Sequence, residues 1–238
     1  MQGFASILSE AWALVLAFDG DLREIIVLSL RVSLTAVFVG AVIGMPLGAW
    51  LATTQSRLRP VLIAFSTALM GLPPVVVGLV VYLLLSNAGA LGPLQLLYTP
   101  TAMIIAQCLL IIPILIALTH ETLFSLHNYY RDQFILLDIA TFSRLKTLLW
   151  EGRHGLVTAL LAGFGRAIAE VGAVIIVGGN INHVTRVMTT TIALETSKGN
   201  LALALGLGIV LVGIALIINI ALLMLGNVVS RQSAIARA

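Results

Sequence analysis

The run from Gly155 to Gly179, GLVTALLAGFGRAIAEVGAVIIVGG, is apolar except for a threonine near its start and two charged residues, Arg166 and Glu170. Apolar runs of about 18 residues or more are long enough to cross a bilayer as a helix. A charge near the middle of such a helix costs about 2.5–3.5 kcal/mol on insertion scales, so by default it indicates a function. The segment therefore predicts a membrane span that carries a functional pair of charges.

The composition of the whole chain indicates the same class. Of its 238 residues, 60% are hydrophobic and only 10% are charged, whereas soluble domains carry about 25% charged residues. A chain in lipid must satisfy its backbone hydrogen bonds internally, which favours helices. We therefore predict an all-α polytopic membrane protein. Its single cysteine, Cys108, excludes an intrachain disulfide.

Five apolar stretches are long enough to be core spans. The shorter apolar segment 4–18 is predicted to be an interfacial helix that lies on the membrane, because it is too short to cross it comfortably. The predicted organisation is an N-terminal interfacial segment (1–22), a transmembrane domain (23–229) and a cytoplasmic tail (230–238). The predicted core spans are 25–53, 61–85, 101–118, 156–177 and 201–225.

The second predicted span is interrupted by the sequence GLPP, from Gly71 to Pro74. Pro73 and Pro74 lack backbone N–H donors, so a kink or a break is expected there. Broken helices at membrane depth often line a pathway, and a simple packing kink explains the same residues equally well. Both interpretations remain open from the sequence.

Basic residues indicate the orientation, because cytoplasmic loops carry an excess of lysine and arginine. The 53–60 loop, the 119–154 stretch and the C-terminal tail hold most of them, so we expect the N-terminus outside and the C-terminus in the cytoplasm. The net charge of +3 is then a topology signal and does not indicate nucleic acid binding. The residues on the expected cytoplasmic side are Arg57, Arg59, Arg131, Arg144, Lys146, Arg153, Arg231 and Arg237, against Arg23, Arg186 and Lys198 outside.

The sequence contains no catalytic machinery. It lacks a G-x-x-x-x-G-K-[ST] motif, so this chain is not expected to bind ATP through a P-loop. Its four histidines have no metal-ligand spacing with cysteine or carboxylates, and each is expected to be solvated or interfacial. The spans also lack the groups of an intramembrane hydrolase. We expect neither enzymatic activity nor a metal site nor a cofactor.

Arg166 and Glu170 are four residues apart, so a continuous helix would place them on one face. Three roles are open for the pair. It could be an ion pair that neutralises itself and fixes helix packing, or an anion-favouring part of a translocation pathway in which Glu170 holds Arg166. A proton relay is the third, although no second carboxylate or histidine lies in a predicted span.

Residues 119–154 are the only long polar stretch, and their hydrophobic positions recur at three- and four-residue spacing, which predicts short amphipathic helices. Together with GLVTALLAGFGRAIAEVGAVIIVGGNI, this stretch resembles the permease subunits of type I ABC importers. The nearest match is the tungstate permease group, beside the molybdate and sulfate permeases. The resemblance covers about residues 23–229 and is densest over 155–208, where VTRVMTTTIALETSKGN and LALALGLG also resemble the tungstate group.

This resemblance implies the five core helices of that permease fold, in a bacterial or archaeal inner membrane and in contact with membrane lipid. It also implies a homodimer, a separate cytoplasmic ATPase that binds the ATP, and a periplasmic or lipid-anchored protein that delivers the oxyanion. The coupling helix would lie at about Asp132–Arg144, although the EAA loop signature of the family is matched weakly. Candidate coupling residues are Asp132, Gln133, Phe134, Asp138, Phe142 and Arg144, and candidate pathway or gate residues are Arg166, Glu170, Gly71, Pro73 and Pro74.

Tungstate is the expected substrate. Molybdate is the nearest alternative and sulfate a further one, because these oxyanions differ little in charge and shape. A non-transporting membrane scaffold is the rival from another class, and in it Arg166 and Glu170 would serve packing alone. An ion-coupled secondary carrier would need inverted repeats or several buried ionisable groups, and the sequence shows neither.

Overall fold

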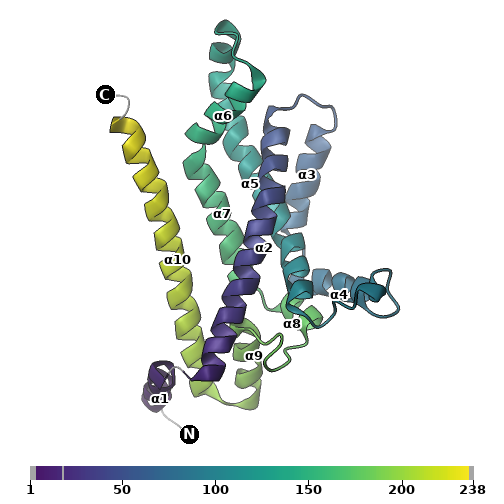
Figure 1. The fold of residues 1–238 in the computed structure, drawn as a ribbon, viewed down its shortest axis with the longest axis vertical. Coiled ribbons are helices and arrows are strands. Elements are labelled where there is room, and N and C mark those ends of the chain that lie inside the picture. Colours follow the sequence, from purple (N-terminus) through teal and green to yellow (C-terminus); the bar gives the residue numbers. More distant parts are fainter. Residues whose placement is uncertain (1–3, 18, 236–238) are drawn as a thin grey trace. The chain divides into compact units, whose positions relative to one another are not determined.

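The computed structural model describes residues 4–17 and 19–235, which form helices and connecting turns without a strand. Three helices are long and apolar enough to cross a membrane, or up to five if each of two bent helix pairs is one span. This confirms the predicted all-α polytopic class. The elements, drawn in Figure 1, are α1 Phe4–Ala17, α2 Gly20–Thr53, α3 Arg59–Met70, α4 Pro74–Leu85, the 3-10 helix η1 Gly92–Leu94, α5 Pro100–Leu136, α6 Thr141–Glu151, α7 Arg153–Ile168, α8 Gly172–Gly178, α9 Met188–Lys198 and α10 Leu201–Ile235.

The chain forms two compact units, each assembled from separate stretches of sequence. Unit 1 contains the described residues of Met1–Ala36, Pro73–Leu109 and Gly165–Ile218. Unit 2 contains those of Val37–Leu72, Leu110–Phe164 and Asn219–Ala238. Helices α2, α5, α7 and α10 contribute residues to both units, so the surroundings of a residue depend on which part of its helix it occupies.

The core of unit 1 joins the start of α2 to α9 and α10 through Leu22, Ile26, Met188 and Leu207. Helix α1 also packs on α10, since a Cβ added to Gly206 would lie 3.2 Å from the Ala11 carbonyl oxygen. The helix predicted over 4–18 is confirmed for Phe4–Ala17, while residue 18 lies outside the described residues. Its position on the membrane surface stays a prediction.

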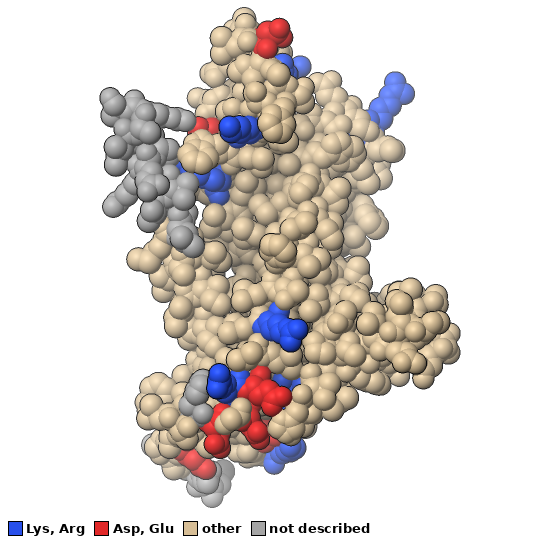
Figure 2. Space-filling view, viewed as in Figure 1, with Lys and Arg blue, Asp and Glu red and all other residues tan. Residues whose placement is uncertain are grey.

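Charged and uncharged surfaces of unit 1 are separated. Acidic and basic side chains gather around the start of α2 and around α9, whereas the surface of α4 is free of charge (Figure 2). A helix that is apolar on all sides suits an apolar environment such as lipid. The surface of α4 is therefore consistent with the membrane class that the composition indicates.

The core of unit 2 depends on close approach between α2 and α5. A Cβ on Gly44 would lie 2.9 Å from the Leu115 Cβ, and one on Gly48 would lie 2.7 Å from the Ile116 carbonyl oxygen. No residue larger than glycine fits at these two positions without backbone movement. Small residues allow such close contact between helices in a bilayer.

The break predicted at GLPP is present, and the third span differs from its predicted end. Helices α3 and α4 are separated at residues 71–73 and bent by 101°. Helix α5 does not end near residue 118 but continues to Leu136, because Leu123 and Phe134 in its polar half remain buried in the unit 2 core. The amphipathic pattern after residue 118 therefore belongs first to a continuation of the span and then to α6.

The fourth span is not the single helix that was predicted over 156–177. Helix α7 ends at Ile168, α8 begins at Gly172, and the two are bent by 54°. Helix α9 contains the sequence TTTIALET. Helix α10 continues beyond the predicted end at residue 225 to Ile235, and Arg237 of the predicted tail lies outside the described residues.

Candidate functional site

Two broken helices meet in unit 1. A Cβ on Gly78 of α4 would lie 2.7 Å from the Cα of Ala173 in α8, so the two backbones touch there. A Cβ on Gly172 would lie 2.8 Å from Val75 Cγ2, which places the first residue of α8 against the first turn of α4 (Figure 1). Pro73 and Pro74 immediately precede this contact. The structure thus brings the second half of the GLPP break to the break between α7 and α8, while Gly71 belongs to unit 2.

Glu170 lies in the break between α7 and α8, so the prediction that it shares a helix face with Arg166 is wrong. The ion pair nevertheless forms, with Arg166 Nη2 3.5 Å from Glu170 Oε2. The backbone N–H of Ala173 donates to Glu170 Oε1 over 3.0 Å, and the Thr189 hydroxyl donates to the Glu170 carbonyl over 2.9 Å. The Glu170 carboxylate thereby satisfies a free N–H at the start of α8.

The two partners of this ion pair differ sharply in exposure. The Glu170 side chain is 3% exposed and the Arg166 side chain is 34% exposed. A buried carboxylate needs compensation by charge and hydrogen bonds, which Arg166 and the Ala173 N–H provide. The arginine therefore holds the carboxylate on one side and presents the rest of its guanidinium to its surroundings.

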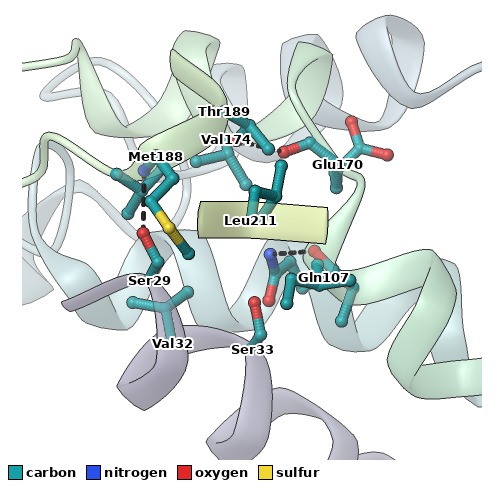
Figure 3. Close-up of a pocket in the computed structure, with 12 residues that line it drawn as sticks. Ser29, Val32, Ser33, Gln107, Glu170, Val174, Met188, Thr189 and Leu211 are labelled. Atoms are coloured by element: carbon teal, nitrogen blue, oxygen red, sulfur yellow. Dashed lines mark hydrogen bonds between the residues drawn. The ribbon is translucent and has the colours of Figure 1, made fainter. Parts of the chain in front are cut away.

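A small polar cavity adjoins Glu170, with a volume of about 10 Å³. Figure 3 shows Ser29, Ser33, Gln107 and Glu170 around it. The Gln107 Nε2 donates to the Ala167 carbonyl over 3.0 Å, but the Gln107 Oε1 is buried without a hydrogen-bond partner among the described residues. A space of this size holds about one water molecule, so it is too small for a tetrahedral oxyanion.

The hydroxyl of Ser29 on α2 completes this part of unit 1, and no pattern in the sequence singles this serine out. The Ser29 hydroxyl accepts a hydrogen bond from the Met188 N–H over 2.7 Å and donates to the Ile25 carbonyl over 2.7 Å. It thereby fixes the start of α9 to α2 (Figure 3). A serine in an apolar run is a common helix residue, so only the long-range contact identifies its role.

The predicted coupling segment Asp132–Arg144 is not one helix. It contains the end of α5, a turn and the start of α6, and Asp138 in the turn has a left-handed φ of 45°. Phe134 is buried, and Arg144 donates to the carbonyls of Ile139 and Phe134. These two candidates are structural within the described residues, because their side chains hold the turn together.

The remaining candidates of this segment lie on the surface. Asp132, Gln133 and Asp138 are exposed, and Phe142 is 80% exposed. Two apolar neighbours that are not among the predicted coupling residues, Leu136 and Leu137, are 83% and 70% exposed. Their spacing resembles that of buried residues, so the pattern alone could not reveal that they face outward.

The histidines differ from one another more than the sequence indicated. His120 is buried, stacks on Phe124 at 5.4 Å between ring centroids and has Nε2 3.3 Å from Arg59 Nη2. It is therefore not solvated, and its interfacial position stays a prediction. His183 lies in an exposed loop with Nδ1 2.7 Å from Glu24 Oε2. The hydrogen bond that the Glu24 carboxylate accepts from the ring raises the pKa of His183. Among the described residues no cluster of three potential metal ligands occurs.

Three curated proteins show what the chain is similar to. It is 40% identical over 219 residues to the tungstate uptake system permease protein TupB of Peptoclostridium acidaminophilum, covering 92% of this chain and 96% of that protein. A probable anion ABC transporter permease protein of Haloferax volcanii is 39% identical over 210 residues, covering 84% of this chain and 90% of that protein. The molybdenum transport system permease protein ModB of Azotobacter vinelandii is 27% identical over 168 residues, covering 67% and 74%.

No family model matches the sequence. The first two relatives exceed the identity and coverage at which family membership is secure, and they align along nearly the whole chain. The helical membrane architecture agrees with this kinship. The chain therefore belongs to the family of ABC transporter permease proteins that includes the tungstate uptake permeases.

Proposed function

We propose that this chain is the membrane subunit of an ABC importer and passes tungstate across the membrane. The observation that carries the proposal is the 40% identity to a tungstate uptake permease over 96% of that protein. The molybdenum permease is a more distant relative at 27% identity, so molybdate is the alternative substrate and sulfate a further one. The chain itself is proposed to have no enzymatic activity and no cofactor, with ATP bound and hydrolysed by a separate subunit.

The proposed pathway passes Arg166 close to the break that contains Pro73 and Pro74. Its support is the geometry of unit 1, where buried Glu170 holds a partly exposed arginine next to two helix breaks. An arginine whose charge is partly compensated attracts an anion without retaining it, and transport requires a ligand to leave as well as to enter. The 10 Å³ cavity is too small to be this pathway, so the anion would meet the exposed side of Arg166.

The proposed assembly is a homodimer with two copies of a cytoplasmic ATPase and an external binding protein. Loops rich in arginine and lysine would face the cytoplasm, with the N-terminus outside. The surface for the ATPase would be the exposed apolar residues Leu136, Leu137 and Phe142, since an apolar surface outside the bilayer indicates a protein partner. Asp132, Gln133 and Asp138 would border this surface.

Helices α6 and α7 join that surface to the charge pair along the chain. Only Gly152 separates them, and a Cβ there would lie 2.9 Å from the Leu123 side chain and the Leu148 carbonyl. This tight packing favours movement of α6 and the start of α7 as one body. Since Arg166 lies in the last turn of α7 and the helix ends two residues before Glu170, a rigid shift of the helix would act on the break that contains Glu170.

Reconstitution with the ATPase and the binding protein tests the substrate. We expect tungstate to stimulate ATP hydrolysis at lower concentrations than molybdate, and sulfate to be weakest. An equal response to all three oxyanions, or no response, would contradict the tungstate assignment.

The double variant Arg166→Leu/Glu170→Leu tests the pathway separately. It removes both charges together and leaves no unpaired ion. We expect assembly with the ATPase to persist and oxyanion-stimulated hydrolysis to be lost. If stimulation persists as well, the charges serve packing alone and the pathway role fails.

A further inference from the structure

We propose that a basic pocket in unit 2 binds a tetrahedral dianion of the tungstate, molybdate or phosphate type. The pocket has a volume of about 350 Å³ and lies where the end of α2, the following loop and the start of α3 meet the polar half of α5. No aspartate or glutamate is among the described residues that line it. It shares no residue with the Arg166–Glu170 pair, and the proposal does not depend on transport. The lining groups that can contact an anion are Thr54, Gln55, Arg59, His127, Asn128 and Arg131.

Two contacts hold the Arg59 guanidinium in place. Its Cζ lies 4.0 Å from the centre of the Phe124 ring, and its Nη2 lies 3.3 Å from His120 Nε2. Neither partner is anionic, so the positive charge is not neutralised. A guanidinium stacked on a ring keeps N–H groups in its own plane, and these match the oxygens of a tetrahedral anion. A donor that is already fixed loses little side-chain entropy when a ligand binds.

Arg131 and His127 approach the pocket from one face of α5, because they are four residues apart on a continuous helix. Arg131 is exposed and forms no ion pair within residues 4–17 and 19–235. His127 Nδ1 is buried without a hydrogen-bond partner among those residues. A buried polar atom without a partner is rare and costly, and an anion oxygen that accepts a hydrogen bond from a protonated Nδ1 would remove that cost.

Charge and size select the ligand class. Two arginines supply the positive charge that balances a dianion, while Thr54, Gln55 and Asn128 supply neutral donors. Charge-assisted hydrogen bonds to oxyanions are stronger than neutral ones. The volume leaves room for a tetrahedral anion with some of its hydration. The ligand is either a free oxyanion or the phosphate of a lipid headgroup, which have the same chemistry.

Binding to the full-length chain in phosphatidylcholine nanodiscs, without ATP or partner proteins, tests the site. The probes are radiolabelled molybdate and inorganic phosphate in equilibrium dialysis at low salt. We expect Arg131→Gln to weaken binding by about tenfold or more. Arg57→Gln removes an equal charge from the loop between α2 and α3 but lies outside the pocket lining, so its binding should equal that of the wild type. Arg59→Lys keeps the charge and loses the planar fork, so an intermediate loss is expected.

Nanodiscs that contain phosphatidic acid distinguish the two sources of the anion. If a lipid phosphate is the ligand, native mass spectrometry should show retained phosphatidic acid that Arg131→Gln removes and Arg57→Gln keeps, with weak binding of the free ions. Equal binding of every probe by Arg131→Gln and wild type would overturn the proposal. So would an Arg131→Gln effect confined to association with the ATPase. Neither result would affect the proposed transport, which is measured separately by oxyanion-stimulated hydrolysis.

Discussion

Arginine occurs in two contrasting settings in this protein. In unit 1, Arg166 is paired with a carboxylate that is 3% exposed, next to a cavity of about 10 Å³. In unit 2, Arg59 and Arg131 line a pocket of about 350 Å³ that has no acidic residue among its described lining groups. The charge of the arginine in unit 1 is therefore partly neutralised in a closely packed site. The arginines in unit 2 keep their charge without an acidic partner and border an open pocket.

This difference in neutralisation shows that an arginine can serve either the passage of an anion or its binding. A guanidinium that already holds a carboxylate attracts an additional anion weakly, which suits a pathway. A guanidinium that is fixed by neutral contacts keeps its full charge for a ligand, which suits binding. Residue identity does not distinguish passage from binding. The distinction depends on whether a buried carboxylate and free space lie beside the arginine.

The largest effect should come from removing the buried carboxylate. Breaking a fully buried ion pair costs about 3–5 kcal/mol, and because Arg166 is one-third exposed we expect Glu170→Ala to cost about 2–3 kcal/mol. Glu170→Gln is the matched control, since its amide oxygen can still accept from the Ala173 N–H. Thermal unfolding in detergent measures both. Arg131→Gln in unit 2 should leave the melting temperature unchanged. If it lowers the melting temperature as much as Glu170→Ala does, the proposed difference between the arginines of the two units is wrong.

A smaller effect on stability is expected from the backbone contact between α4 and α8 in unit 1. In Gly78→Ala the new Cβ would lie 2.7 Å from the Ala173 Cα, so α4 and α8 must separate, at a cost of about 1–2 kcal/mol. Gly208→Ala is the control, because a Cβ there meets nothing within 4 Å and alanine favours the helix. Thermal unfolding of the two variants should move in opposite directions. Equal melting temperatures would show that the contact between Gly78 and Ala173 does not stabilise unit 1.

The smallest effect should come from the exposed pair of Glu24 and His183. The pKa of His183 is raised by its hydrogen bond to Glu24, so the pair stabilises the fold most below the ordinary histidine value of 6.5 and loses that contribution as pH rises through the raised pKa. The melting temperature of Glu24→Gln should therefore fall slightly below that of the wild type at pH 6 and approach it at pH 9. A difference that grows with pH would contradict this assignment.

The class of protein and several local features follow from the order of residues alone. Length and composition of the apolar runs predict membrane helices because the bilayer requires them. The two prolines predict the break between α3 and α4, since they lack donors. The glycines of the first span predict close packing, which Gly44 and Gly48 show against α5. Resemblance to the permease family likewise depends only on the order of residues, and the relatives confirm it.

The break at Glu170, the length of α5 and the basic pocket depend on contacts between distant segments. Helix α7 ends at Ile168, and in the break that follows the Glu170 carboxylate accepts from the backbone of α8 while its carbonyl accepts from Thr189; nothing in the run FGRAIAEVGAV indicates such a break. Helix α5 continues past residue 118 because Leu123 and Phe134 are buried against distant residues. The basic pocket joins Thr54 and Arg59 to His127 and Arg131, which are about 70 residues away in sequence. Propensity and periodicity act over a few residues, whereas these contacts depend on which distant segments pack together.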